Sequence, residues 1–216
     1  MDNNKYKNKI NKEREKCEKI IKKLYGNVYY FMHGTTETSI ENILKSGKIK
    51  IGTHTDDRNF THESYLSLPY AYCNIEFDDV PIKYMRPLFP FILLIHPKIL
   101  YDYNIIFNNS WNRRPDTNSI YINKKDTFNN KKQKINDIKN SLIKLNSKEK
   151  YFYQNDHEIL FTKDINLKDN LIGIICCNYN FYPAKQIIKL LKKYGYDNIK
   201  IYEDINEFPL LCDLLL

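Results

Sequence analysis

The sequence predicts a mixed α+β domain whose strands lie on either side of a cleft. Two observations support this fold class: apolar runs of strand length recur along the chain, and amphipathic segments of helical spacing separate them. With 216 residues, of which 42% are hydrophobic, the chain can bury one sizeable core. No apolar run approaches the ~20 residues that a membrane-spanning helix needs, so we expect no membrane partner.

Amphipathic spacing and end signals predict four of the expected helices. The first is rich in Lys and Glu and forms an N-terminal extension over residues 1–26, ahead of a single domain over 27–216. The second begins with the sequence Thr-Ser-Ile-Glu of a capping box and ends at a glycine. The third lies within an insertion at about 108–150. These four helices are expected at 9–25, Thr38 to Gly47, 131–146, and Pro183 to Gly195.

Apolar and β-branched runs predict the strands. "PFILLIHP" at 90–97 is continuously apolar between two prolines, which is typical of a central strand. The strand "SYLSL" (64–68) is expected to lead through Pro69 into a short helix that carries Tyr70, Ala71, Tyr72 and Cys73. An edge strand is expected at 119–122 within a long loop. The other expected strands are 27–33, 48–52, 157–161, 171–177 and 198–202.

Charge and cysteine content narrow the classes of function. The net charge of +8 would suit a nucleic acid, but only five of the 34 basic residues are Arg, and phosphate recognition favours Arg. Nucleic-acid binding therefore remains one of the alternatives. The five cysteines lack CxxC spacing, and the N-terminus lacks an apolar signal core. We expect reduced thiols and no metal site. We also expect a cytoplasmic protein, which would lie in the cytoplasm of the host cell if it comes from a virus or pathogen.

Three features of the sequence can carry chemistry. They are His33-Gly34-Thr35 at the end of a predicted strand, the tyrosine cluster at 65–72, and Glu158 at the start of another strand. A histidine at a strand end is available to a ligand, and a glycine behind it lets the ligand approach the backbone. Each feature alone also has an ordinary interpretation, as a solvated histidine, packing tyrosines or a surface carboxylate. Their order along the chain makes them a candidate site.

The order "FMHGT…NILKSGKIK…SYLSLPYAYC…PFILLIHP…DHEILF" resembles the ADP-ribosyltransferase fold of the His-Tyr-Glu type over roughly residues 28–177. That group includes poly(ADP-ribose) polymerase catalytic domains, diphtheria-type toxins and DNA-modifying toxins. The resemblance implies a split mixed sheet around an NAD cleft and, without a metal, transfer of ADP-ribose to a protein or nucleic acid. Two alternatives share the fold: an RNA 2′-phosphotransferase-like enzyme, and an inactive module that binds ADP-ribose or nucleic acid.

The resemblance also implies which residues hold the nucleotide. His33 would hydrogen-bond the adenosine-side ribose, the Gly34 backbone would hold the nicotinamide amide, and Thr35 completes the motif. Glu158 would bind the 2′-hydroxyl of the nicotinamide ribose. Cleavage of the nicotinamide–ribose bond builds positive charge on the ribose, which a nearby carboxylate stabilises.

Tyrosines would enclose the nicotinamide ring. By the same resemblance, Tyr65 and Tyr72 would lie against its two faces, and Tyr70 could replace either of them. Aromatic faces hold a flat cationic ring by stacking and cation–π attraction. The sequence departs from the polymerases at Pro69, where they carry a serine that holds the nicotinamide amide.

Acceptor-side residues are expected in two segments. Asp156 precedes Glu158 by two positions, so both side chains would share a strand face, and the resemblance makes Asp156 a candidate for positioning the accepting group; a turn residue is the alternative interpretation. "SWNRRPD" (110–116) presents Trp111, Arg113 and Arg114, which suit a phosphate or a nucleic-acid strand. Packing of the Trp on the domain beside solvated Arg is equally compatible with the sequence.

Overall fold

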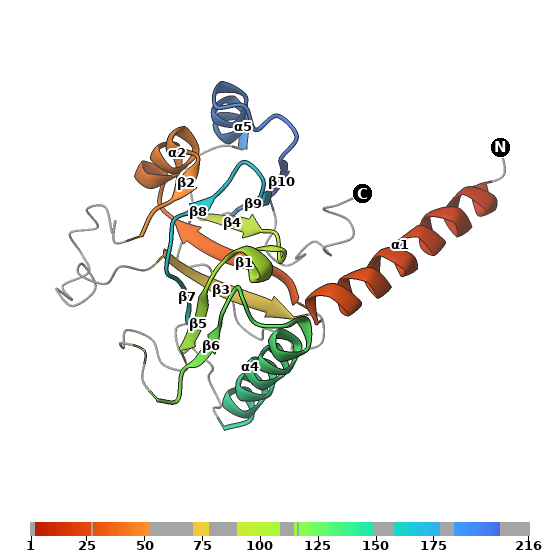
Figure 1. The fold of residues 1–216 in the computed structure, drawn as a ribbon. Coiled ribbons are helices and arrows are strands. Elements are labelled where there is room, and N and C mark those ends of the chain that lie inside the picture. The colour runs from red at the N-terminus through yellow and green to blue at the C-terminus, as the bar shows by residue number, and fades with distance from the viewer. Residues whose placement is uncertain are drawn as a thin grey trace.

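The computed structural model describes residues 3–26, 28–51, 71–77, 90–108, 115, 117–148, 158–177 and 184–203. Figure 1 shows a central sheet with helices around it and one long helix that runs outward. In chain order the elements are α1 (Asn3–Tyr25), β1 (Val28–Thr35), α2 (Glu37–Ser46), β2 (Lys48–Ile49), β3 (Ala71–Phe77), β4 (Phe91–Ile95), α3 (Ile99–Asp102), β5 (Ile105–Asn108), β6 (Ile120–Ile122), α4 (Phe128–Lys148), β7 (Glu158–Phe161), β8 (Ile165–Asn166), β9 (Leu171–Cys176), α5 (Ala184–Lys193) and β10 (Lys200–Tyr202).

The main sheet is mixed, so the predicted α+β class is confirmed. Its eight strands follow the order β10-β9-β4-β1-β3-β7-β5-β6, and β2 pairs with β8 in a separate ladder. β10 runs parallel to β9, and the other neighbours in the main sheet run antiparallel. The parallel pair is joined through α5, as a strand-helix-strand unit requires.

Two apolar cores cover the two faces of the sheet. All five residues of β4 are buried, and they alternate between the cores: Phe91, Leu93 and Ile95 enter the larger one, Ile92 and Leu94 the smaller. Helices α2, α3, α4 and α5 all contribute buried residues to the larger core, whereas α1 contributes Ile21 to the smaller. The prediction of a central strand at 90–97 is confirmed, as is the edge strand, now β6.

Vicinal Cys176 and Cys177 belong to opposite cores. Burial raises the pKa of their thiols to about 11 and about 12. This arrangement agrees with the expectation of buried reduced thiols.

The predicted capping box at Thr38 is wrong. Helix α2 begins at Glu37 with Thr36 as its N-cap, so Thr38 is already helical. Glu41, which a capping box would turn back to the N-cap backbone, instead accepts hydrogen bonds from Lys193 and Tyr194 of the segment 184–203. The predicted end is confirmed, because Gly47 is left-handed at φ 67° and closes the helix.

The predicted helix through Ala71, Tyr72 and Cys73 is also wrong. These residues begin strand β3, which pairs with β1 on one side and β7 on the other. Alternating β-formers and two neighbouring strands outweigh the helix-starting signal of Pro69. The strand predicted at 64–68 and Tyr70 lie outside the described residues. Strands β5 and β8 and the single-turn α3 were not expected.

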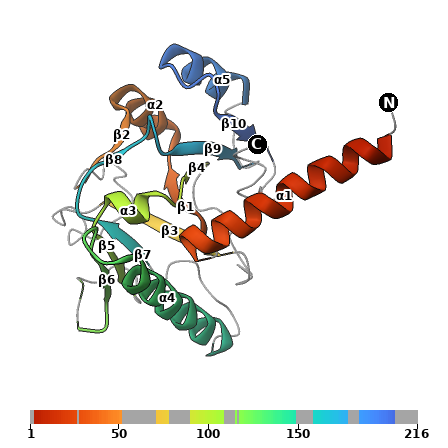
Figure 2. The same cartoon turned by 45° about the vertical axis from the view of Figure 1, so that its right-hand side comes forward.

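Among the described side chains of α1, those that contact the smaller core lie in its C-terminal half. Cys17, Ile21 and Tyr25 contact the smaller core, while Ile20 and Leu24 are exposed. Figures 1 and 2 show the rest of the helix running away from the body in both views.

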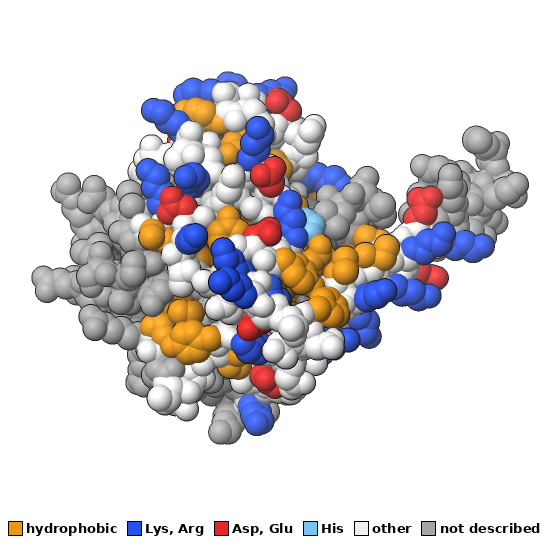
Figure 3. Space-filling view, in the orientation of Figure 1, with side chains coloured by type: hydrophobic (Ala, Val, Ile, Leu, Met, Phe, Trp, Pro, Cys, Tyr) orange, Lys and Arg blue, Asp and Glu red, His pale blue; other side chains and the backbone are white. Residues whose placement is uncertain are grey.

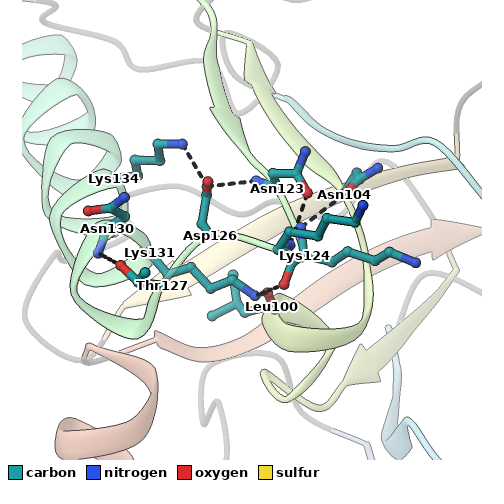
Figure 4. A network of polar contacts seen from close by, with 10 residues as sticks. Leu100, Asn104, Asn123, Lys124, Asp126, Thr127, Asn130, Lys131 and Lys134 are labelled. Atoms are coloured by element: carbon teal, nitrogen blue, oxygen red, sulfur yellow. Dashed lines mark hydrogen bonds and ion pairs between the residues drawn. The ribbon is translucent and has the colours of Figure 1, made fainter.

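A polar network fixes the start of α4, as Figure 4 shows. Buried Lys131 donates from Nζ to the carbonyls of Leu100 (3.1 Å) and Lys124 (3.0 Å), and burial lowers its pKa. Asp126 accepts from Lys134 at 2.6 Å and from the Asn123 N–H at 2.8 Å. Because α4 also buries Ile135, Ile138 and Leu142 in the larger core, it is part of the scaffold.

Candidate active site

The His-Gly-Thr motif forms the last three residues of β1. His33, Gly34 and Thr35 pair with Leu93, Ile92 and Phe91 of β4. His33 and Gly34 are half-buried, and Thr35 is 4% exposed. A rigid central strand therefore fixes the motif on one side.

The main sheet splits beside this motif. The β1–β3 ladder covers Val28 to Met32 and ends where Met32 pairs with Asn74. The first part of β3, Ala71 to Cys73, pairs instead with Phe161 to Ile159 of β7. Strand β3 thus joins two half-sheets, one that contains β1 and one that contains β7. The motif residues of β1 follow directly after the last residue of β1 that pairs with β3. Among the described residues, their ladder partners are those of β4.

The other two motif positions lie on the next two strands. Tyr72 pairs with Leu160, which lies two residues after Glu158. Glu158 is the first residue of β7 and pairs with Asn108, the last residue of β5. Positions 33, 72 and 158, which are far apart in sequence, therefore lie on three neighbouring strands, β1, β3 and β7.

Asn108 is a candidate that the sequence did not reveal. It lies at the start of the segment interpreted as a loop, yet its side chain is 2% exposed and its backbone pairs with Glu158. A buried polar side chain at a strand end is typical of a functional or structural hydrogen-bond role. In a sequence so rich in Asn, the residue type gave no signal.

Several predicted site residues lie outside the described ranges. They are Tyr65, Tyr70, Trp111, Arg113, Arg114 and Asp156. Tyr72 and Glu158 are described by their place in the sheet. In the described part of the chain, no group of three or more His, Cys, Asp or Glu could hold a metal ion.

His96, at the end of β4, has a structural role. Its backbone N–H donates to the Asn170 carbonyl at 2.8 Å, its Nδ1 accepts from the Lys98 N–H at 2.9 Å, and its ring lies edge-on to Tyr25. Burial, with a smaller contribution from the Lys98 charge, lowers the pKa of His96 to about 4. The folded protein therefore keeps this ring neutral.

We expect the free energy of unfolding to fall as pH drops from about 6.5 to about 4. In that window the unfolded chain protonates His96 and the folded protein does not. The contribution of neutral His96 to the free energy of unfolding is therefore fully present above pH 6.5 and is lost as the pH falls toward 4. Because water reaches part of the ring, we expect a loss on the order of 2 kcal/mol. Urea unfolding across this range measures it. His96→Asn should flatten the slope, and an unchanged slope would show that other groups cause it.

Comparison with known proteins places the chain in a family. A family model described as a family of unknown function (DUF5846) matches residues 26–145, more than half of the sequence. The chain belongs to the DUF5846 family. The match runs from the residues before β1 into α4, so it includes the His-Gly-Thr motif and Tyr72.

This DUF5846 protein also resembles a viral protein along nearly its whole length. It is 32% identical over 232 residues to uncharacterized protein R11 of Acanthamoeba polyphaga mimivirus, which covers 98% of this chain and 85% of that protein. Among the helices that the structure describes, none has the length and apolar character needed to cross a bilayer.

Among solved structures, DarT from Thermus sp. 2.9 in complex with NAD⁺ aligns at 11% identity with a TM-score of 0.48. The alignment covers 81% of this chain and 95% of DarT. Because this TM-score does not establish a common fold, we base the proposed function on this chain's own strands and motif.

Proposed function

We propose that this DUF5846 protein is an ADP-ribosyltransferase: it binds NAD⁺, releases nicotinamide and transfers ADP-ribose to a protein or nucleic-acid acceptor. The observation that carries the proposal is the grouping of the His-Gly-Thr motif, Tyr72 and Glu158 on three consecutive strands where the sheet splits.

The proposed chemistry assigns each motif position a task. His33 hydrogen-bonds the adenosine-side ribose, and the Gly34 backbone holds the nicotinamide amide. Tyr72 lies against the nicotinamide ring. Glu158 binds the 2′-hydroxyl of the nicotinamide ribose and stabilises positive charge as the bond to nicotinamide breaks. The electron pair of that bond leaves with nicotinamide, and the acceptor's nucleophile attacks the ribose carbon.

Burial and fixed geometry support this assignment. The backbone of the motif is held by β4, whose residues are all buried, so His33 and Gly34 are positioned before a ligand binds. Asn108, buried beside the Glu158 position, is a suitable hydrogen-bond partner for orienting a carboxylate.

Calorimetry with NAD⁺ tests the binding part of the proposal. His33→Ala removes a ribose hydrogen bond and should weaken binding by about 10-fold, which corresponds to about 1.4 kcal/mol. His157→Ala is the matched control, because this histidine precedes Glu158 and has no assigned role. Equal affinities for the two variants would contradict the role of His33.

Transfer of ADP-ribose to candidate acceptors tests the catalytic part of the proposal. NAD⁺ labelled on its adenylate should pass label to protein, DNA or RNA, and the labelled class identifies the acceptor. Binding of NAD⁺ without nicotinamide release or label transfer would instead identify an inactive binding module.

A further inference from the structure

Helix α1 presents an exposed apolar strip beside its attachment to the body. Ile20 is 56% exposed and Leu24, one turn later, is 39% exposed. On the neighbouring side of the helix, which faces the body, Ile21 is buried in the smaller core and Tyr25 packs against that core. More than half of Ile20 and more than a third of Leu24 therefore remain uncovered where α1 is attached.

The strip continues onto the body through two aromatic side chains. The Tyr101 hydroxyl donates to the Leu24 carbonyl, and the Tyr101 ring stacks on Phe128 with ring centroids 6.5 Å apart. Phe128 is itself 42% exposed. We call Ile20, Leu24, Tyr101 and Phe128 the α1-base patch. Figure 3 shows apolar side chains gathered where α1 meets the body and basic side chains farther along the helix.

Lysines line one side of this patch. At 100° per residue, Lys12, Lys16, Lys19 and Lys23 all fall beside the Ile20–Leu24 strip, and all four are exposed. Glu13 is the acidic residue within the strip, whereas Glu18 lies on another side, where it pairs with Arg14 at 3.9 Å. From Lys12 to Leu24 this face is about 18 Å long, which matches the side of a short helix.

We propose that the α1-base patch and its lysines bind an acidic amphipathic helix of a partner protein. Apolar side chains of the partner would pack on the patch, and its carboxylates would face the lysines. A projecting helix gains from such a partner, because a helix without tertiary packing is marginal in water.

Charge and side-chain chemistry disfavour other occupants. A second copy would bring the same lysines against these lysines, at an electrostatic cost. A nucleic acid would use the lysines but leave the aliphatic Ile20 and Leu24 uncovered, and one face of Phe128 is already stacked on Tyr101. The strip is also narrow for burial in a membrane surface.

Fluorescence anisotropy with the full chain tests the proposal. The probe is a labelled helical peptide with Leu at i, i+3 and i+4 positions and Glu elsewhere; the control peptide has Lys in place of Glu. The Glu peptide should bind at least ~10-fold more tightly than the Lys peptide, with an affinity that falls as salt rises. Ile20→Asp should weaken binding by ~10-fold or more. Ile188→Asp on α5, where the native side chain is 41% exposed, should leave binding unchanged.

Equal binding of both peptides, or equal effects of the two substitutions, would overturn the proposal. It would also be overturned if a DNA oligonucleotide or an anionic vesicle bound tightly, Ile20→Asp weakened that binding, and the Glu peptide did not bind. A concentration-dependent dimer that Ile20→Asp dissociates would assign the patch to a second copy. Circular dichroism of each variant separates loss of binding from loss of folding. None of these outcomes depends on NAD⁺.

Discussion

Glu158→Gln is expected to lower nicotinamide release from NAD⁺ by about 10²- to 10³-fold. The substitution keeps the shape of the side chain and removes the charge that would stabilise the cationic ribose. Because the amide still forms hydrogen bonds, NAD⁺ affinity should change by less than ~10-fold. The effect should therefore appear in kcat and not in KM.

Glu15→Gln on α1 is the matched control, since this carboxylate is exposed and lies on the outward-running helix. It should leave both release and affinity unchanged. If Glu158→Gln retains more than a third of wild-type turnover while folding normally, Glu158 is not the electrostatic catalyst.

Phe161→Ala is expected to destabilise the fold by about 3–5 kcal/mol. Phe161 ends β7, is fully buried, and packs edge-on against Phe31 of β1 and Tyr103, with ring centroids 5.6 and 5.8 Å apart. Its contact with Phe31 ties the half-sheet of β7 to the half-sheet of β1. Removing the ring leaves a cavity at the junction that holds the two halves of the candidate site in register.

Urea unfolding followed by circular dichroism measures this loss. Phe128→Ala, the same substitution at a half-exposed ring on α4, should cost less than ~1 kcal/mol. Similar shifts of the unfolding midpoint for the two variants would mean that the junction contributes no more than an ordinary surface contact.

Most elements could be predicted where apolar periodicity was strong. A continuous apolar run such as that of β4 is favourable as a strand buried on both faces. The spaced isoleucines of α4 are favourable as a helix buried along one stripe. The end of α2 could also be predicted, since Gly47 occupies a left-handed conformation that other residues avoid.

Neither the first residue of α2 nor the secondary structure of residues 71–77 could be predicted from the local sequence. Thr36 and Thr38 are both acceptable N-caps, and the position of the end of β1 decides between them. Thr35 pairs with Phe91 of β4, so β1 extends to Thr35 and the helix begins directly after Thr36. Residues 71–77 form a strand because β1 pairs with one part of it and β7 with the part that holds Tyr72, and both partners are remote in sequence. Local propensity cannot report such pairings.

The sequence predicted which residue types form the candidate site and their order along the chain. The positions of these residues relative to one another follow from the strand pairing, which the sequence did not reveal. Nothing near His33 in sequence indicates that the β1–β3 ladder ends at Met32, or that β7 takes over the pairing with β3. Asn108 was missed for the same reason, because its importance comes from its pairing with Glu158.

Nicotinamide release from NAD⁺ by the purified full chain tests the proposed activity most directly. It should be measured with NAD⁺ alone and with protein extract, DNA or RNA added as acceptors. We predict release that exceeds the uncatalysed rate, increases with an acceptor, and is lost in Glu158→Gln. No release under any of these conditions, together with no NAD⁺ binding by calorimetry, would contradict the proposal that the split in the sheet is an NAD⁺ site.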